Sequence, residues 1–218
     1  MTVAFFDLDK TLISVNSANL WLKREWQKGS LNKQDLLKLS FGLLRYSFGL
    51  VNLEKDFRSA ITMLKGRAYS KLESDGEKFY NTHIRNLYRP GALAALKYHQ
   101  EQRHSIIILT TSPRLFARWP AKDLGVQHCI STELEVDEFG LCTGNPLGSL
   151  CYGKGKVELA TRWLQQNGET LENSVFYSDS FTDKPMLEVV GHPVVVNPDP
   201  RLMRLATTRQ WPIVDWGR

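Results

Sequence analysis

Short apolar runs that alternate with helix-patterned segments constrain the fold of this chain more than any other feature of its sequence. Four runs have the length and composition of buried strands, and they cover residues 3–8, 105–109, 174–178 and 193–196. The segments between them repeat apolar residues three and four positions apart, which is the period of an amphipathic helix. Strands that alternate with helices in this way predict an α/β fold with a doubly wound, mainly parallel sheet.

The segment between the first two strands is long and contains no convincing strand. Its apolar residues predict four helices, over 18–28, 33–48, 54–64 and 70–87. A Pro-Gly pair at 90–91 marks its end, and a helix over 92–102 leads back into the sheet. We therefore predict an all-helical insertion over 15–87 within a Rossmann-like core that is formed by 1–14 and 88–218.

Several further elements follow the second strand. The sequence predicts a helix over 113–124, a hairpin from 128–136 that turns through 138–140, a helix over 156–166 and a helical link over 183–190. The aromatic tail over 211–216 is expected to pack into the core.

The composition limits the classes of protein that the chain can be. Its 218 residues are 42% hydrophobic and 23% charged, which excludes low-complexity and wholly disordered chains. Three cysteines are too few for a disulfide scaffold, and acidic residues interrupt the first apolar run too early for a signal peptide. Charged residues also interrupt the longest apolar stretch, over 36–53, so we predict a cytoplasmic protein without a membrane span.

The net charge of +5 leaves a nucleic-acid-binding module as an alternative from a different functional class. Such a module needs a stripe of Lys and Arg residues, whereas this sequence has only scattered basic pairs such as Lys23-Arg24. We therefore expect no nucleic-acid partner.

Polar side chains follow three of the predicted strands at their carboxyl ends. They are Asp7, Asp9 and Thr11 after the first strand, Thr110, Thr111 and Ser112 after the second, and Asp179 and Asp183 after the third. In an open α/β sheet the ligand binds at these ends, so the residues are expected to share one crevice. Four carboxylates in one crevice repel each other, and Mg²⁺, which prefers oxygen ligands, relieves that repulsion. A bound Mg²⁺ beside a free carboxylate indicates phosphoryl transfer with the carboxylate as nucleophile.

These residues resemble the four motifs of the haloacid dehalogenase superfamily. The motifs are Asp7-Leu8-Asp9-Lys10-Thr11-Leu12, Thr110 after the second strand, Lys156 ahead of a helix, and Asp179-Ser180-x-x-Asp183-x-Pro185-Met186-Leu187. The chain is more closely similar to the phosphoserine-phosphatase-like subfamily, which carries a helical cap between its first and second motifs. This resemblance covers nearly the whole chain. It implies a Mg²⁺-dependent hydrolase of small phosphate monoesters that acts through an aspartyl-phosphate intermediate.

The resemblance also implies a role for each matching residue. Asp7 would be the nucleophile and a metal ligand, and Asp9 would be the general acid and base and would add its main-chain carbonyl oxygen to the metal site. Asp179 and Asp183 would complete that site. The alternative for Asp9 or Thr11 is that it only caps a turn, and the alternative for Asp183 is that it is the N-cap of a helix.

Thr110 and Lys156 would hold the oxygens of the phosphoryl group and neutralise developing charge. Lys154 is a competitor two residues earlier, but Lys156 is favoured because it directly opens the next predicted helix. The stretch Gly148-x-x-x-x-Gly153-Lys154 matches most of a nucleotide-binding P-loop. Gly155 stands where that loop needs a Ser or Thr, so we interpret the stretch as a flexible loop.

In this family the cap usually selects the leaving group, and two positions here differ from those of phosphoserine phosphatases. Asn16 stands where those enzymes carry a glutamate for the substrate ammonium group, and Thr111 and Ser112 stand where they carry two glycines. We expect these three residues and Thr11 to bind the substrate. Both differences speak against phosphoserine itself, and the alternatives are histidinol phosphate, a glycerophospholipid phosphate, or transfer of the phosphate to an acceptor.

One stretch of the insertion, over 36–51, combines helix-spaced apolar residues with Lys38 and Arg45. Packing within the insertion or onto the core explains this pattern. The alternative is an apolar, basic lid that makes peripheral contact with a lipid phosphate or a membrane surface.

Overall fold

The computed structural model describes residues 2–29 and 53–217, and it is built around a six-stranded sheet in the order β3-β2-β1-β6-β7-β8. The strands are β1 (Val3–Phe6), β2 (Ser105–Pro113), β3 (His128–Thr132), β6 (Ser174–Ser178), β7 (His192–Val196) and β8 (Ile213–Val214). Every neighbouring pair in this sheet is parallel. The predicted doubly wound α/β fold is therefore confirmed.

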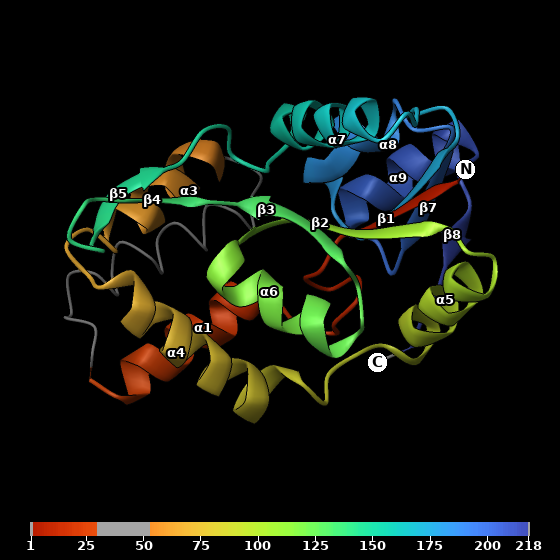
Figure 1. Ribbon diagram of the computed structural model, residues 1–218. Helices are drawn as coiled ribbons and strands as arrows, with labels where there is room; N and C mark the ends of the chain where they lie inside the picture. Colours follow the sequence, from red (N-terminus) through yellow and green to blue (C-terminus); the bar gives the residue numbers. More distant parts are fainter. Residues whose placement is uncertain (1, 30–52, 218) are drawn as a thin grey trace.

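Helices cover both faces of the sheet (Figure 1). On one face lie α7 (Lys154–Gln166), α8 (Lys184–Leu187) and α9 (Pro200–Arg209), and on the other lie α5 (Pro90–Glu101) and α6 (Arg114–Asp123). Val3 and Phe5 of β1 belong to the hydrophobic core under the first set, whereas Ala4 and Phe6 belong to the core under the second. All four residues of β1 are buried because helices cover both faces, which explains why this strand is apolar throughout.

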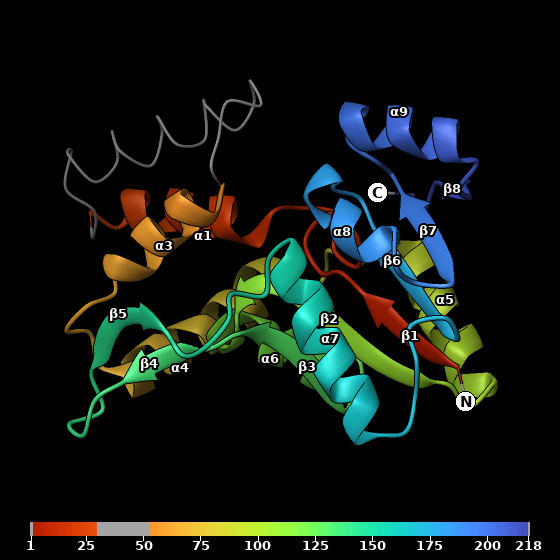
Figure 2. The same cartoon turned by 90° about the horizontal axis from the view of Figure 1, so that it is seen from above.

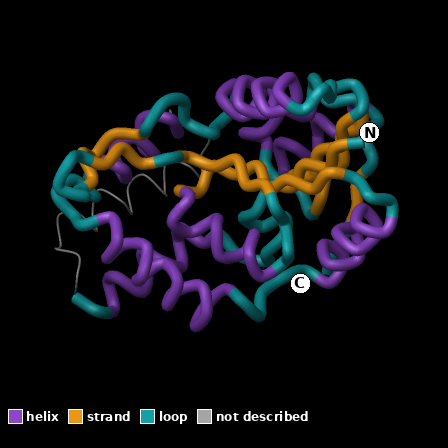
Figure 3. Tube along the Cα trace, in the orientation of Figure 1, coloured by secondary structure: helices purple, strands orange, loops and turns teal. Residues whose placement is uncertain are grey.

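The described part of the insertion between β1 and β2 is helical (Figure 3). It contains α1 (Ser17–Gln27), α3 (Leu53–Thr62), α4 (Tyr69–Phe79) and a π-helical turn (Tyr80–Ile84). The predicted helix over 33–48 and the predicted lid over 36–51 lie outside the described residues. Across residues 2–29 and 53–217, none of the helices has the length and apolar character that a membrane crossing requires.

The predicted helix over 70–87 is interrupted where α4 gives way to the π-helical turn. The main-chain N–H of Arg85 donates to the carbonyl oxygen of Tyr80, a bond across five residues that widens the turn. The hydroxyl of Tyr80 donates to Asp123 on α6 at 2.5 Å and contacts the hydroxyl of Tyr88 at 2.9 Å. These tertiary contacts hold the insertion against the core at its second junction.

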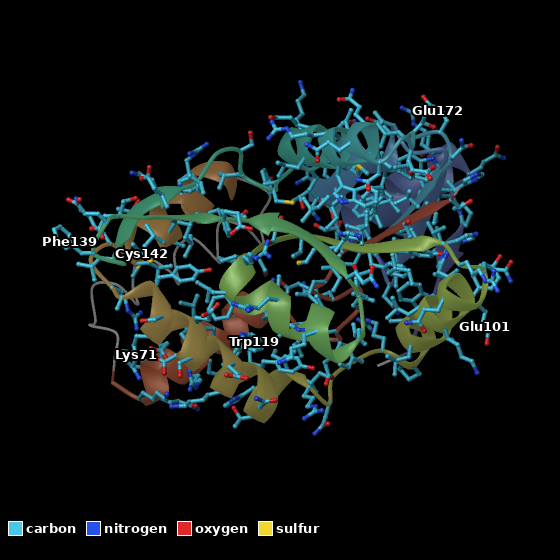
Figure 4. The ribbon with its side chains drawn as sticks, in the orientation of Figure 1. Lys71, Glu101, Trp119, Phe139, Cys142 and Glu172 are labelled. Carbon is cyan, nitrogen blue, oxygen red and sulfur yellow. The ribbon has the colours of Figure 1, made fainter. Side chains whose placement is uncertain are left out.

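The predicted hairpin was wrong in its first arm. Residues His128–Thr132 form β3, the parallel edge strand beside β2, and the hairpin consists of β4 (Leu134–Val136) and β5 (Cys142–Pro146). The hairpin lies against the insertion (Figure 2), where Gly66 N–H donates to the carbonyl oxygen of Cys142 at 2.8 Å. Phe139 at its tip points away from the molecule and is 79% exposed (Figure 4).

The C-terminal region contains α9 and β8, which the sequence analysis did not predict. Asp199 caps α9 by accepting the N–H groups of Arg201 and Leu202 at 2.8 and 2.9 Å. The expected packing of the aromatic tail is confirmed for Trp216, which lies against Tyr177 with ring centroids 5.1 Å apart, whereas Ile213 in the same stretch is 40% exposed. The predicted helical link over 183–190 is shorter than expected, with a 3-10 turn over Phe181–Asp183 followed by α8.

Candidate active site

The candidate site lies at the carboxyl ends of β1, β2 and β6. Because β1 pairs with β2 on one side and with β6 on the other, the polar residues that follow these strands come together. Asp7 directly follows β1, and its main-chain N–H donates to the carbonyl oxygen of Tyr177 on β6 at 3.0 Å. The sheet thereby holds the backbone of Asp7.

A buried ammonium group joins two of the carboxylates. Lys156 is 1% exposed, and its Nζ donates to Oδ1 of Asp7 and to Oδ2 of Asp183, both at 2.8 Å. Asp183 Oδ2 also accepts a hydrogen bond from the hydroxyl of Ser178 at 2.7 Å. Lys154 is exposed, so of the two lysines it is Lys156 that enters the site.

The loop ahead of α7 explains how Lys156 reaches this position. Gly153 precedes the helix with φ +53°, a conformation that L-residues rarely adopt, and Gly155 lies in the first turn. A Cβ at Gly155 would lie 1.9 Å from the carbonyl oxygen of Leu150, so only glycine permits this close approach. Gly153, from the stretch that resembles a P-loop, and Gly155 therefore serve the tight turn that brings Lys156 to Asp7.

Thr11 joins the loops that follow β1 and β6. Its Oγ1 lies 3.4 Å from Asp7 Oδ2 and 3.4 Å from Asp179 Oδ1, and it accepts the main-chain N–H of Asp179 at 3.1 Å. Thr11 is fully buried. The predicted substrate-binding hydroxyl therefore contacts two carboxylates and a backbone amide in this structure.

Asp9 points toward the junction of the core and the insertion. Its Oδ1 accepts the main-chain N–H of Ser17, the first residue of α1, at 2.7 Å. Its Oδ2 accepts the hydroxyl of Ser112, at the end of β2, at 2.8 Å. The sequence analysis did not include Ser17, although its place directly after a helix-capping Asn was a usable signal.

The other predicted substrate-binding and phosphate-binding residues surround this centre. Thr110 is buried, and its Oγ1 accepts the main-chain N–H of Ser112 at 3.2 Å. Thr111 is partly exposed. Asn16 is the N-cap of α1 and accepts the N–H of Asn19 at 2.9 Å, so its amide oxygen stabilises the start of this helix.

Burial and mutual repulsion perturb the carboxylates. Burial raises the pKa of Asp7 to about 7, against the attraction of Lys156 and with the repulsion of Asp183. Burial, together with the charges of Asp7 and Asp183, also raises the pKa of Asp179. Desolvation raises the pKa of Asp9, whereas the hydrogen bonds from Ser17 and Ser112 oppose the rise. A positive charge added next to these carboxylates would therefore stabilise their ionised forms and lower their pKa values.

Lys156 responds in the opposite direction. Burial alone would lower its pKa, but the attraction of Asp183 and Asp7 outweighs burial and raises the pKa of Lys156 above its ordinary value. The ammonium group is therefore charged throughout the physiological range.

The donor set fits Mg²⁺ at the pair Asp7 and Asp179. The single buried ammonium of Lys156 contacts only Asp7 and Asp183, and Asp183 Oδ1 is buried without a hydrogen-bond partner among the described residues. Within residues 2–29 and 53–217, no three acidic, His or Cys side chains form a preassembled metal cluster, because Lys156 and Thr11 lie between the carboxylates. Mg²⁺ is commonly held by one or two carboxylates, with waters and substrate phosphate as further ligands, so this pair is sufficient.

Comparison with known proteins identifies a family. The sequence model of the family described as haloacid dehalogenase-like hydrolase matches residues 4–188. A probable phosphatase of Mycobacterium tuberculosis is 32% identical over 222 residues, which cover 100% of this chain and 76% of that protein. A histidinol-phosphatase of Neisseria meningitidis is 27% identical over 98% of both chains.

Solved structures share the same fold. A protein of unknown function from Bordetella pertussis Tohama I superimposes with a TM-score of 0.89 and 28% identity, over 99% of both chains. A phosphoserine phosphatase, solved as an analogue of its phospho-aspartyl intermediate, gives a TM-score of 0.72 with 18% identity, over 99% of this chain and 93% of the other. The second likeness shows the fold alone.

Proposed function

The chain belongs to the haloacid dehalogenase-like hydrolases, and from this premise we propose that it is a Mg²⁺-dependent phosphatase of a small phosphate monoester with Asp7 as its nucleophile. The observation that carries the proposal is the placement of Asp7. Its carboxylate is buried at the carboxyl end of the central strand, between Lys156 at 2.8 Å and the carboxylate of Asp179 across Thr11. The relatives named as phosphatases support the reaction class.

In the first step a carboxylate oxygen of Asp7 attacks phosphorus and forms an acyl-phosphate bond. The bond between phosphorus and the leaving oxygen breaks, and Asp9 donates a proton to that oxygen so that a neutral alcohol leaves. In the second step Asp9 accepts a proton from water, the water oxygen attacks phosphorus, and the bond to Asp7 breaks. Asp7 and Asp9 are thereby returned to their starting states, and inorganic phosphate is released.

Lys156 supports both steps through its position. Its buried ammonium holds Asp7 Oδ1, which orients the nucleophile, and its positive charge offsets the negative charge that develops on the phosphoryl oxygens. Asp183 holds Lys156 from the other side. Mg²⁺ at Asp7 and Asp179 would supply further charge neutralisation for the phosphate dianion.

Thr110 and Thr111 are proposed to contact the phosphoryl group. Thr110 Oγ1 accepts a hydrogen bond from the N–H of Ser112, so its own hydrogen remains to be donated. Thr111 is partly exposed and follows it directly on β2.

Histidinol phosphate is the first candidate substrate to test. The Neisseria histidinol-phosphatase is 27% identical to this chain, and the match covers 98% of each of the two sequences. Phosphoserine is the second candidate, because a phosphoserine phosphatase of Mycobacterium tuberculosis is 29% identical over 98% of this chain. Asn16 caps α1 and offers no carboxylate to the ammonium group that both candidates carry, so this residue does not distinguish between them.

The proposal is tested with purified protein, Mg²⁺ and a panel of phosphate monoesters that includes both candidates, sugar phosphates and nucleotides. Phosphate release from at least one member is expected, and Asp7→Asn should abolish it because an amide is not a nucleophile toward phosphorus. Glu101→Gln is the matched control, since it makes the same carboxylate-to-amide change on exposed α5, far from the site (Figure 4). Wild-type turnover by Asp7→Asn would refute the mechanism.

A further inference from the structure

We propose that Ser112 is a positioning residue that orients the carboxylate of Asp9, rather than a group that binds the substrate. This inference rests on the proposed function, in which Asp9 transfers the proton. Ser112 Oγ donates to Asp9 Oδ2 at 2.8 Å, and Ser112 is 6% exposed. Its hydroxyl is therefore directed at Asp9 and is shielded from competing water.

The two oxygens of Asp9 are held by donors of different kinds. Oδ1 accepts a main-chain N–H from Ser17 at 2.7 Å, and a backbone amide can only donate. That bond would be weakened if Oδ1 carried a proton, because a protonated carboxyl oxygen is a poorer acceptor. Oδ2 is therefore the oxygen that can exchange a proton with the leaving group or with water, and Oδ2 is the oxygen that Ser112 contacts.

The Ser112 hydroxyl suits a partner that is alternately charged and neutral. A hydroxyl both donates and accepts, and a second partner is available because Ser17 Oγ lies 3.4 Å from Ser112 Oγ. Ser112 can direct its hydrogen to Oδ2 when Asp9 is ionised and to Ser17 when Oδ2 carries the proton. The carboxylate is thus held in one orientation through the reaction.

The backbone around Ser112 holds the hydroxyl in place. The main-chain N–H of Ser112 donates to Oγ1 of Thr110 at 3.2 Å, and Pro113, the N-cap of α6, follows directly. On the opposite side of Asp9, Ser17 is the first residue of α1. Asp9 is consequently fixed between the core and the first helix of the insertion, and Ser112 is the contribution of the core.

The experiment compares two substrates of similar shape that differ in leaving-group basicity. p-Nitrophenyl phosphate releases a stabilised phenolate that needs little protonation, whereas phenyl phosphate releases a more basic one. General acid catalysis contributes roughly 10²–10⁴-fold, so Ser112→Ala is expected to lower kcat/KM for phenyl phosphate by about 10- to 100-fold and to lower it distinctly less for p-nitrophenyl phosphate. The inhibition constant of inorganic phosphate should stay within about twofold, because binding of the phosphate is not changed.

Two further variants separate positioning from a structural role. Ser112→Thr keeps the hydroxyl and should restore most of the phenyl phosphate activity. Ser149→Ala is the matched control, because it removes a hydroxyl that hydrogen-bonds Glu158 on α7 instead of a site residue. Far-ultraviolet circular dichroism and thermal melts establish that each variant is folded.

Equal losses for both substrates together with a weaker inhibition constant for phosphate would show that Ser112 binds substrate, and would overturn the inference. Wild-type kinetics in Ser112→Ala would also overturn it. If either result is obtained while Asp7→Asn is inactive, the inference about Ser112 fails and the proposed function stands. Activity that survives in Asp7→Asn would refute the proposed function instead.

Discussion

Replacement of Lys156 by Met tests the electrostatics of the site most directly. The substitution removes the one buried ammonium that lies between Asp7 and Asp183, whose side chains are 9% and 2% exposed. Removal of one partner from a buried ion pair costs about 3–5 kcal/mol, because the remaining charge is left uncompensated. For a chain of this size about 2–4 °C accompanies each kcal/mol, so the melting temperature should fall by about 6–20 °C.

The loss should depend on pH in a defined direction. Burial raises the pKa of Asp7 from 3.8 to about 7, so the folded protein holds this proton more tightly than the unfolded chain does. The stability that this group contributes is therefore full below pH 3.8 and is lost as the pH rises through about 7. Without Lys156 the repulsion grows, and the destabilisation of Lys156→Met should be largest at pH 8 and smaller at pH 5.

Urea unfolding followed by circular dichroism, in EDTA at both pH values, measures these quantities. Lys154→Met is the matched control, because it removes an exposed lysine two residues away and should change stability by less than about 0.5 kcal/mol. The double variant Lys156→Met with Asp183→Asn should recover part of the loss, since one of the uncompensated charges is gone. A loss below about 1 kcal/mol at pH 8, or a loss that does not shrink at pH 5, would refute the reasoning.

Three further predictions concern other parts of the molecule. Burial, and to a lesser extent the charge of His104, lowers the pKa of His99 from 6.5 to about 4. The contribution of neutral His99 to the free energy of unfolding is therefore complete above pH 6.5 and falls by up to about 3 kcal/mol as the pH drops toward 4. Urea midpoints at pH 7 and 4.5 should therefore differ less in His99→Gln than in the wild type, and an equal difference would contradict this account. Gly91→Ala should cost about 1–3 kcal/mol in urea unfolding, since a Cβ would lie 2.5 Å from the ring of Trp216, and Trp216→Ala should relieve part of that cost. EDTA should abolish phosphatase activity, and Asp179→Asn should raise the Mg²⁺ concentration for half-maximal activity by at least about 10-fold; an unchanged requirement would exclude Asp179 as a ligand.

The strands of the core could be predicted where burial on both faces left a continuous apolar run. The run over 174–178 coincides with β6, and the run over 3–8 contains β1. The edge strand β3 was instead predicted as one arm of the hairpin. Its pairing with β2, from Ile107 opposite His128 onward, joins residues that are distant in the sequence, so no local pattern distinguishes it from a hairpin arm.

The candidate site was also predictable in part. The four motifs follow from residue types at the ends of strands, and the structure brings Asp7, Thr11, Lys156, Asp179 and Asp183 into one connected set of polar contacts. The hydrogen-bond partner of each hydroxyl and amide side chain was not predictable. Asn16 caps α1, because helix ends compete for such polar side chains.

What the sequence determined by itself is the alternation of strands and helices and the placement of acidic and hydroxyl residues just after the strands, since both depend on local periodicity and residue type. The tertiary structure decided which groups meet. It selected Lys156 over Lys154 through the turn at Gly153 and Gly155, and it placed Ser17 and Ser112 on opposite sides of Asp9. These outcomes depend on distances between segments that are far apart in the chain, and hydrogen bonds are sensitive to differences of a few tenths of an ångström.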